Sequence, residues 1–124
     1  MKEITKKLKY LIILLITSYG FSQTARVQVI HNSPDAAASE VDVYLNDVKL
    51  LDNFKFRTAT PFIDAPAGVP IKIDIAPGTS TSSAESIYTV SPTLTSGETY
   101  VIVANGIVSP TGYSSAPNFG LDIF

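Results

Sequence analysis

The stretch "VDVYLNDVK", residues 41–49, decides the fold class of this chain. Valine or leucine occupies positions 41, 43 and 45, and Asp42 and Tyr44 stand between them. Successive side chains of a β-strand leave opposite faces, so this alternation indicates a half-buried strand. We therefore expect the valine and leucine face to point inward, and Asp42 and Tyr44 to point toward solvent.

Turn signals surround this strand. Asn46 and Asp47 separate it from the next apolar run, and both residue types tolerate the positive φ of a two-residue hairpin. Further turns are indicated by "PAG" at 66–68, "APG" at 76–78 and "TSGE" at 95–98. A turn about every ten residues is the spacing of a sandwich or barrel.

The whole pattern predicts an all-β protein, an antiparallel Ig-like or Greek-key β-sandwich of about seven or eight strands. No segment has a long helical stripe, and residues 78–86, "GTSTSSAES", are expected to form a polar loop. The strands are predicted near residues 25–31, 41–45, 48–52, 54–57, 61–65, 69–76, 86–91 and 98–106.

Residues 1–22 have the pattern of a secretory signal peptide. Four lysines come first, the apolar run "LIILLIT" follows, and small or polar residues end the segment. We expect cleavage between Ser22 and Gln23 and an exported product in the periplasm, at the cell surface or outside the cell. A membrane anchor is the alternative, but a spanning helix needs about 20 apolar residues and this run is much shorter.

The net charge and the absence of cysteine limit the functions that this protein can have. Residues 1–22 carry four lysines and one glutamate, so five basic and ten acidic residues remain, a net charge of −5. The remaining cations are scattered, which argues against nucleic-acid binding. The chain has no cysteine, which excludes disulfides, thiol nucleophiles and zinc–thiolate sites. We expect one domain over 23–108, and a tail or the start of a linker over 109–124.

The stretch "HNSPD", residues 31–35, contains the only histidine of the chain. Histidine, serine and aspartate are the residue types of a hydrolytic triad. However, Pro34 interrupts the strand, no "GxSxG" elbow occurs, and Asn32, Ser33 and Asp35 are residues that bond their own backbone in turns. We interpret His31 to Asp35 as a structural turn, and a hydrolase that uses His31 remains an alternative.

Metal binding is not expected, and no cofactor is predicted. Calcium requires six to eight converging oxygens, and the chain has no D-x-D-x-D-G loop. The carboxylates of the first half are dispersed and are interpreted as solvated surface: Asp35, Glu40, Asp42, Asp47, Asp52 and Asp64.

Aromatic residues suggest one weak ligand site. An outward Tyr44 beside Asp42 could stack on a sugar ring and accept its hydroxyls, and Tyr113 lies in a Gly/Ser/Pro-rich tail. Cross-strand pairing is the more common role of such a tyrosine. Phe54 and Phe56 alternate with basic residues and are interpreted as core packing.

The run "RVQVIHNSPDAAASEVDVYLNDVKLLDNFKFRTATPFIDAPAG" resembles a bacterial extracytoplasmic family known as domain of unknown function 4397. Its pattern is R-V-x-V-x-H-x-S-P-D, a V-D-V-Y strand, an asparagine hairpin, a phenylalanine strand and a "PAG" turn. The resemblance extends from Arg26 to about Val108. It implies an exported β-sandwich, often in tandem copies or ahead of a C-terminal sorting segment, and it implies no reaction. The Gln23 start after "GFS" resembles exported proteins of the Bacteroidetes.

Three functions follow from these observations. The first is a non-catalytic structural or interaction module of the cell envelope, which binds a protein or a sister domain. The second is a carbohydrate-binding module, with a glycan as partner, and the third is the hydrolase that uses His31. Because the sequence ends on apolar Leu121, Ile123 and Phe124 in strand-like alternation, we expect it to be cut before a second module.

Overall fold

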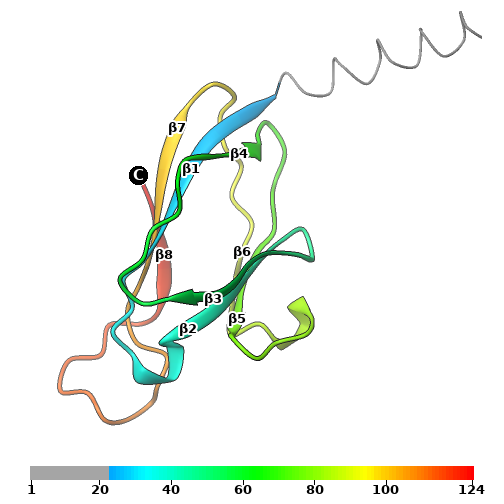
Figure 1. Ribbon diagram of the computed structural model, residues 1–124. Coiled ribbons are helices and arrows are strands. Elements are labelled where there is room, and N and C mark those ends of the chain that lie inside the picture. Colours follow the sequence, from blue (N-terminus) through cyan, green and yellow to red (C-terminus); the bar gives the residue numbers. More distant parts are fainter. Residues whose placement is uncertain (1–22) are drawn as a thin grey trace, which may run out of the picture.

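The computed structural model describes residues 23–124, which form two four-stranded β-sheets packed as a sandwich (Figure 1). The first sheet has the order β4-β1-β7-β8, and the second has the order β3-β2-β5-β6. This confirms the all-β sandwich. The strands of the first sheet are β1 Thr24–His31, β4 Ile63–Pro66, β7 Thr99–Asn105 and β8 Gly120–Ile123. Those of the second sheet are β2 Glu40–Leu45, β3 Val48–Lys55, β5 Ile73–Pro77 and β6 Tyr88–Val90.

The core lies between the sheets and consists of aliphatic side chains. The alternation in β2 places Val41 and Val43 in it, as expected. Its buried members come from both sheets and the loops that join them: Ala25, Val27, Val29, Ala38, Val41, Val43, Ala65, Ala67, Ile71, Ile73, Ile75, Leu94 and Ile102. On one flank of the sandwich, the rings of Tyr88 and Phe119 pack edge to face with centroids 5.5 Å apart.

The predicted hairpin is present between β2 and β3. Asn46 has φ 47° and Asp47 has φ 68°, so both residues adopt the left-handed conformation that a tight two-residue turn requires. Asn46 Oδ1 also accepts a hydrogen bond from the backbone N–H of Lys72, which ties the turn to the start of β5.

One strand pairing differs from the antiparallel expectation. β1 and β7 are parallel, in a register that runs from Arg26 opposite Thr99 to His31 opposite Ala104. The chain reaches β7 from the second sheet through a crossover, and a crossover returns the strand in the direction of β1. The carboxyl ends of β1 and β7 therefore lie side by side.

Several predicted boundaries need correction. The predicted strands 48–52 and 54–57 are one strand, β3, which stays continuous through Asn53 although that residue has φ 51°. The predicted strand 69–76 begins later, at β5, because Pro70 makes only an isolated bridge with Thr93.

The predicted tail also needs correction. The end of 109–124 forms β8, which pairs antiparallel with β7 and extends the first sheet. The Gly-, Ser- and Pro-rich residues before it resemble a linker in composition, and this concealed the strand.

The predicted signal peptide, residues 1–22, lies outside the described residues. Within residues 23–124, no helix has the length and hydropathy needed to cross a membrane. The helical elements there are two short 3-10 turns, η2 Ala36–Ala38 and η3 Ser83–Glu85.

Candidate binding groove beside the His31–Asp35 turn

The predicted ligand platform of Asp42 and Tyr44 is buried. Asp42 is 0% exposed and Tyr44 is 3% exposed, although both lie on the face of β2 that was expected to be solvated. Ser80, from the loop between β5 and β6, covers them: its Oγ donates to Asp42 Oδ2 at 2.5 Å and lies 2.9 Å from Tyr44 Oη. The prediction of an outward platform was wrong, because alternation assigns a residue to a face but not the loop that covers the face.

The carboxylate of Asp42 is stabilised by several donors. Burial alone would raise its pKa, but hydrogen bonds from Ser80 Oγ and Asn53 N, with the ammonium of Lys49 3.1 Å away, lower the pKa below its ordinary value. The bond to Asp42 raises the pKa of Lys49 to about 12. This network binds the covering loop to β2 and β3 and keeps Asp42 and Tyr44 away from solvent.

The interpretation of the carboxylates as solvated surface is therefore wrong for Asp35 and Asp42, and Asp74 is also buried. Asp74 Oδ1 accepts from Thr89 Oγ1, and its Oδ2 lies 3.3 Å from Lys72 Nζ. Over residues 23–124, no three histidine, cysteine or acidic side chains come together as metal ligands would.

His31, at the end of β1, is buried with both ring nitrogens engaged. Nε2 lies 2.7 Å from the carbonyl oxygen of Ala38, and Nδ1 accepts a bond from the backbone N–H of Ser33 at 3.3 Å. These partners select the neutral tautomer with the proton on Nε2. Burial lowers the pKa of His31, and the bond to Ala38 offsets part of this effect. The rings of Phe54 and Phe56 pack around the imidazole, with centroids 5.9 and 6.0 Å away.

Ser33 and Asp35 bind the loop that follows β7. Ser33 Oγ donates to the carbonyl oxygen of Gly106 at 2.7 Å. Asp35 is 1% exposed and accepts from five donors. They are Ala37 N at 2.9 Å, Val108 N at 2.8 Å, Ser109 N at 2.6 Å, Ser109 Oγ at 2.8 Å and Tyr113 Oη at 3.2 Å.

We call Ser33 and Asp35, with their partners Gly106, Val108 and Ser109, the clasp. Burial alone would raise the pKa of Asp35, but the bonds from Ser109 and from the backbone of Ala37 and Val108 outweigh it and hold the pKa well below its ordinary value. The clasp joins segments more than seventy residues apart and uses the carboxylate in its charged form.

The three residue types of a hydrolytic triad do not form one here. Asp35 bonds the clasp rather than the imidazole, Ser33 Oγ donates to a backbone carbonyl, and the group of Ser33 that contacts His31 is its N–H. A triad needs the serine hydroxyl on one ring nitrogen and the carboxylate on the other. The structure thus places His31, Asn32, Ser33, Pro34 and Asp35 in a hydrogen-bonded turn.

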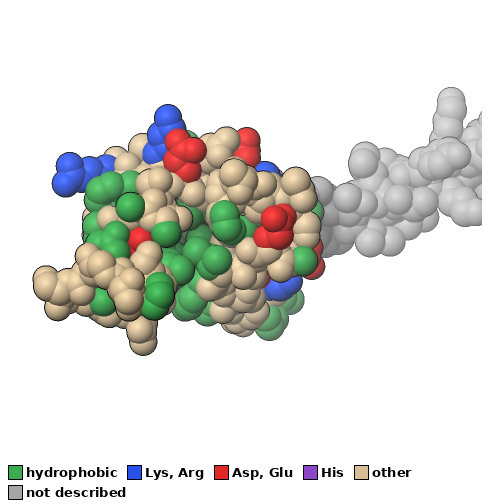
Figure 2. Space-filling model, turned by 90° about the horizontal axis from the view of Figure 1, so that it is seen from below, with side chains coloured by type: hydrophobic (Ala, Val, Ile, Leu, Met, Phe, Trp, Pro, Cys, Tyr) green, Lys and Arg blue, Asp and Glu red, His purple; other side chains and the backbone are tan. Residues whose placement is uncertain are grey.

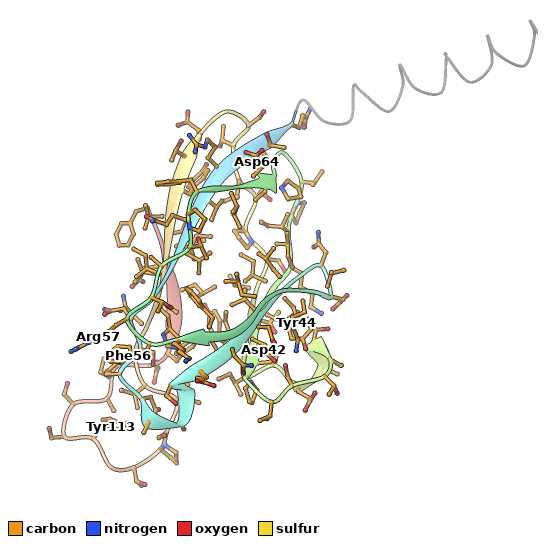
Figure 3. The ribbon with its side chains drawn as sticks, in the orientation of Figure 1. Asp42, Tyr44, Phe56, Arg57, Asp64 and Tyr113 are labelled. Atoms are coloured by element: carbon orange, nitrogen blue, oxygen red, sulfur yellow. The ribbon has the colours of Figure 1, made fainter. Side chains whose placement is uncertain are left out.

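A groove of about 380 Å³ lies beside this turn. Figure 2 views the molecule from the end below Figure 1, where hydrophobic side chains gather in the middle of the face and Lys and Arg lie at its margin. In Figure 3, Phe56 and Arg57 lie at the same end as Tyr113, whereas Asp64 lies at the opposite end. The groove is lined by Asn32, Pro34, Phe56, Asn105, Gly106, Ile107, Ser115 and Pro117.

Asn32 and Asn105, which supply side-chain amides to the groove, belong to a chain of side chains across three strands of the first sheet. Asn32 Nδ2 donates to Asn105 Oδ1 at 2.8 Å, and Asn105 Nδ2 donates to Asp122 Oδ2 at 2.9 Å. The aromatic part of the groove is Phe56, which is half-buried, with the guanidinium carbon of Arg57 5.2 Å from the ring centroid.

Phe56 was interpreted as core packing, and Asn105 was not singled out. Asn32 and Asn105 follow and end the strands β1 and β7, respectively. They meet only because those strands are parallel, and the sequence did not reveal that pairing.

A second cavity lies between the sheets but is small, about 50 Å³. Its lining is almost entirely aliphatic, including Val29, Ile73 and Ile102. Ligand sites usually measure about 300 to 1,000 Å³. The interior cavity is below that range. A further hollow beside Glu40, Asn53 and Gly78 measures about 300 Å³, and the groove beside the turn exceeds it, so the groove is the better candidate site.

Comparison with known proteins gives a family without a described activity. No curated protein and no solved structure matches the chain. A family described as Domain of unknown function (DUF4397) matches residues 25–118, which include both the turn and the loop bound by the clasp. This chain belongs to that family, DUF4397.

Proposed function

We propose that this protein is a non-catalytic binding module of an exported protein, and that the groove beside the His31–Asp35 turn is its binding surface. The observation that carries the proposal is that the serine and the aspartate of the turn hold the wall of the groove in place. Ser33 and Asp35 are committed to holding the loop after β7, and that loop supplies Ile107, Ser115 and Pro117 to the groove wall. A rigid loop pair around a groove is an arrangement suited to recognition.

Export is supported by the pattern of residues 1–22, and the absence of cysteine leaves the fold independent of redox conditions. The partner is a macromolecule outside the cytoplasm: a protein, a sister domain or a glycan. The hydrolase alternative is disfavoured, since Ser33 Oγ and both nitrogens of His31 are engaged in other bonds.

The test is a ¹H–¹⁵N NMR titration of the protein recovered after expression of the full chain. A peptide library and a mixed glycan library are added separately. We expect a ligand from one library to shift the side-chain amide resonances of Asn32 and Asn105 while those of Asn46, in the distant hairpin, stay in place. Shifts confined to other surfaces would contradict the proposal.

Catalysis is tested in parallel on a panel of esters and peptides. We expect no turnover above that of the His31→Gln variant. Turnover that this substitution abolishes, while the variant is still folded at the assay temperature, would establish the hydrolase and remove the proposal.

A further inference from the structure

We infer that the groove accepts an uncharged saccharide, with a sugar ring against Phe56 and sugar hydroxyls bonded to the side-chain amides of Asn32 and Asn105. This inference rests on the proposed function, because it names the chemical class of the ligand for the same groove. It replaces the platform of Asp42 and Tyr44, which is buried.

The amide pair has the hydrogen-bonding capacity that sugar hydroxyls require. A side-chain amide has two N–H donors and a carbonyl acceptor, and a hydroxyl both donates and accepts. Asn32 uses one donor on Asn105, which leaves its other N–H and its Oδ1 for a ligand. Asp122 accepts from Asn105 and so fixes the orientation of the second amide. The pair is oriented before a ligand arrives, which reduces the entropy lost on binding.

Phe56 supplies the apolar surface. Its ring is packed by Arg57 at 5.2 Å and by the imidazole of His31 at 6.0 Å, so it has little freedom to lose on binding. Pro34 and Pro117 add rigid apolar walls. A sugar ring presents C–H groups on its face and hydroxyls at its rim, and an aromatic ring beside amides matches both.

The charges around the groove favour a neutral ligand. None of the residues that line it is charged, and Asp122, whose carboxylate accepts from Asn105, lies outside the lining. The nearest carboxylate of the turn, Asp35, is buried under five donors, and Arg57 lies over the ring of Phe56. A strongly anionic ligand would require clustered cations, and none lines this groove.

The position of the groove disfavours an extended peptide. Peptides commonly bind by adding a strand to an exposed sheet edge. Asn105 ends β7. This strand lies between β1 and β8 inside the first sheet, so it has no free edge to which a peptide strand could be added. The carbonyl of Gly106 is used by Ser33. The polar side chains that line the groove are the amides of Asn32 and Asn105 and the hydroxyl of Ser115.

The experiment is a broad array of neutral and acidic glycans probed with the labelled protein. NMR titration with the best-binding neutral oligosaccharide then follows. We expect neutral glycans to bind and the Asn32 and Asn105 resonances to shift. Phe56→Ala and Asn32→Ala should each weaken binding by about tenfold, the effect of one lost stacking contact or one pair of hydrogen bonds.

Phe62→Ala is the matched control. Phe62 is 40% exposed and has the guanidinium of Arg26 5.4 Å from its ring centroid, yet it does not line the groove. Its removal should leave binding unchanged. Since Phe56 packs on His31 and its removal could unfold the turn, the exposed Asn32 provides a second variant that preserves the packing.

No bound glycan on the array, preference for acidic glycans, or binding unaffected by Asn32→Ala would overturn the saccharide inference. If peptides instead shift the groove resonances, the inference fails but the binding module stands. If neither library shifts them, both fail.

Discussion

His31 is the residue whose chemistry is most constrained by the fold. Its Nε2–H donates to Ala38 and its Nδ1 accepts from Ser33. A second proton would sit on Nδ1, directly against the N–H of Ser33, and would charge a ring packed between Phe54 and Phe56. The folded state therefore favours the neutral imidazole, which agrees with the lowered pKa.

This gives a pH dependence with a definite sign. When the pH falls below 6.5, the ordinary pKa of histidine, His31 binds a proton more readily in the unfolded chain than in the folded one. The stabilising contribution is therefore present above about pH 6.5 and is lost as the pH falls through the lower folded pKa. The urea midpoint of the protein should fall between about pH 7 and pH 5.5, above the range in which carboxylates titrate.

His31→Gln is the control, because glutamine can donate to Ala38 but does not titrate. Its midpoint should be lower at pH 8 and nearly constant down to pH 5.5. Equal slopes for both proteins across this range would show that His31 does not carry the effect.

Asp42 and Asp52 allow a matched comparison, since both pair with Lys49. Asp42→Ala removes the acceptor of Ser80 and Asn53 in a buried site and should lower the free energy of unfolding by about 2 to 3 kcal/mol. Asp52 has a side chain that is 64% exposed, so Asp52→Ala should cost no more than about 0.5 kcal/mol. Urea denaturation measures both, and equal losses would contradict the role assigned to the Asp42 network.

At the scale of elements, the loop after β7 depends on a close backbone approach. Gly106 has φ 85°, and a Cβ built there would lie 2.2 Å from the carbonyl oxygen of Asn118. Gly97 has a nearly identical φ of 83° but open space around it. Comparing alanine substitutions at the two glycines therefore separates the cost of the left-handed backbone conformation from the cost of a steric clash with Asn118.

Gly97→Ala should cost about 1 to 2 kcal/mol, the price of a left-handed alanine. Gly106→Ala should cost at least about 2 kcal/mol more, because backbone atoms of Asn118 cannot move aside cheaply. Chemical denaturation of both variants checks this. If Gly106→Ala is no worse than Gly97→Ala, the backbone at Gly106 does not approach that of Asn118 as closely as described.

Local patterns predicted the elements that depend on local geometry. Asn46 and Asp47 predicted the hairpin, and the valines of β2 predicted the face that packs in the core. Both predictions succeeded because turn conformation and strand alternation depend on neighbouring residues. The short strand β8 was missed, because its stability comes from pairing with β7 rather than from its own four residues. The contact between Ser80 and Tyr44 was also missed, because it joins residues that are far apart in the sequence.

The candidate site was predicted only in part. Proline, serine and aspartate in "HNSPD" predicted a turn, but nothing in the neighbouring sequence identifies Val108 and Ser109 as partners of Asp35. The meeting of Asn32 with Asn105 follows from the parallel pairing of β1 and β7. Predicting contacts between residues more than seventy positions apart requires the order and direction of the strands, and the alternation of apolar residues does not provide these.

At the scale of the whole molecule, the clasp joins the segment that follows β1 to the loop that follows β7, so two segments far apart in the sequence stabilise each other. The chain has no cysteine, so hydrogen bonds, ion pairs and apolar packing stabilise the fold without a disulfide. A domain of about 100 residues is large enough to be stable without disulfides.

The proposed export makes a prediction about the intact protein. When the full chain is expressed in a Gram-negative host, the species outside the cytoplasm should begin at Gln23. Intact-mass spectrometry of the exported fraction would show the loss of residues 1–22. Replacing Leu14 and Leu15 by arginine should keep the full-length chain inside the cell, because the apolar run would be broken. Retention of the full-length mass in the exported fraction would contradict a cleaved signal.

The central claim is that Asp35 holds the loop after β7 in place, and amide hydrogen exchange followed by NMR tests it most directly. In the native protein, the amides of Val108 and Ser109 should exchange slowly, because both donate to Asp35. In Asp35→Ala they should exchange rapidly, while the amides of β2 and β5 keep their protection. Fast exchange at Val108 and Ser109 in the native protein, or protection unchanged by the substitution, would contradict the account.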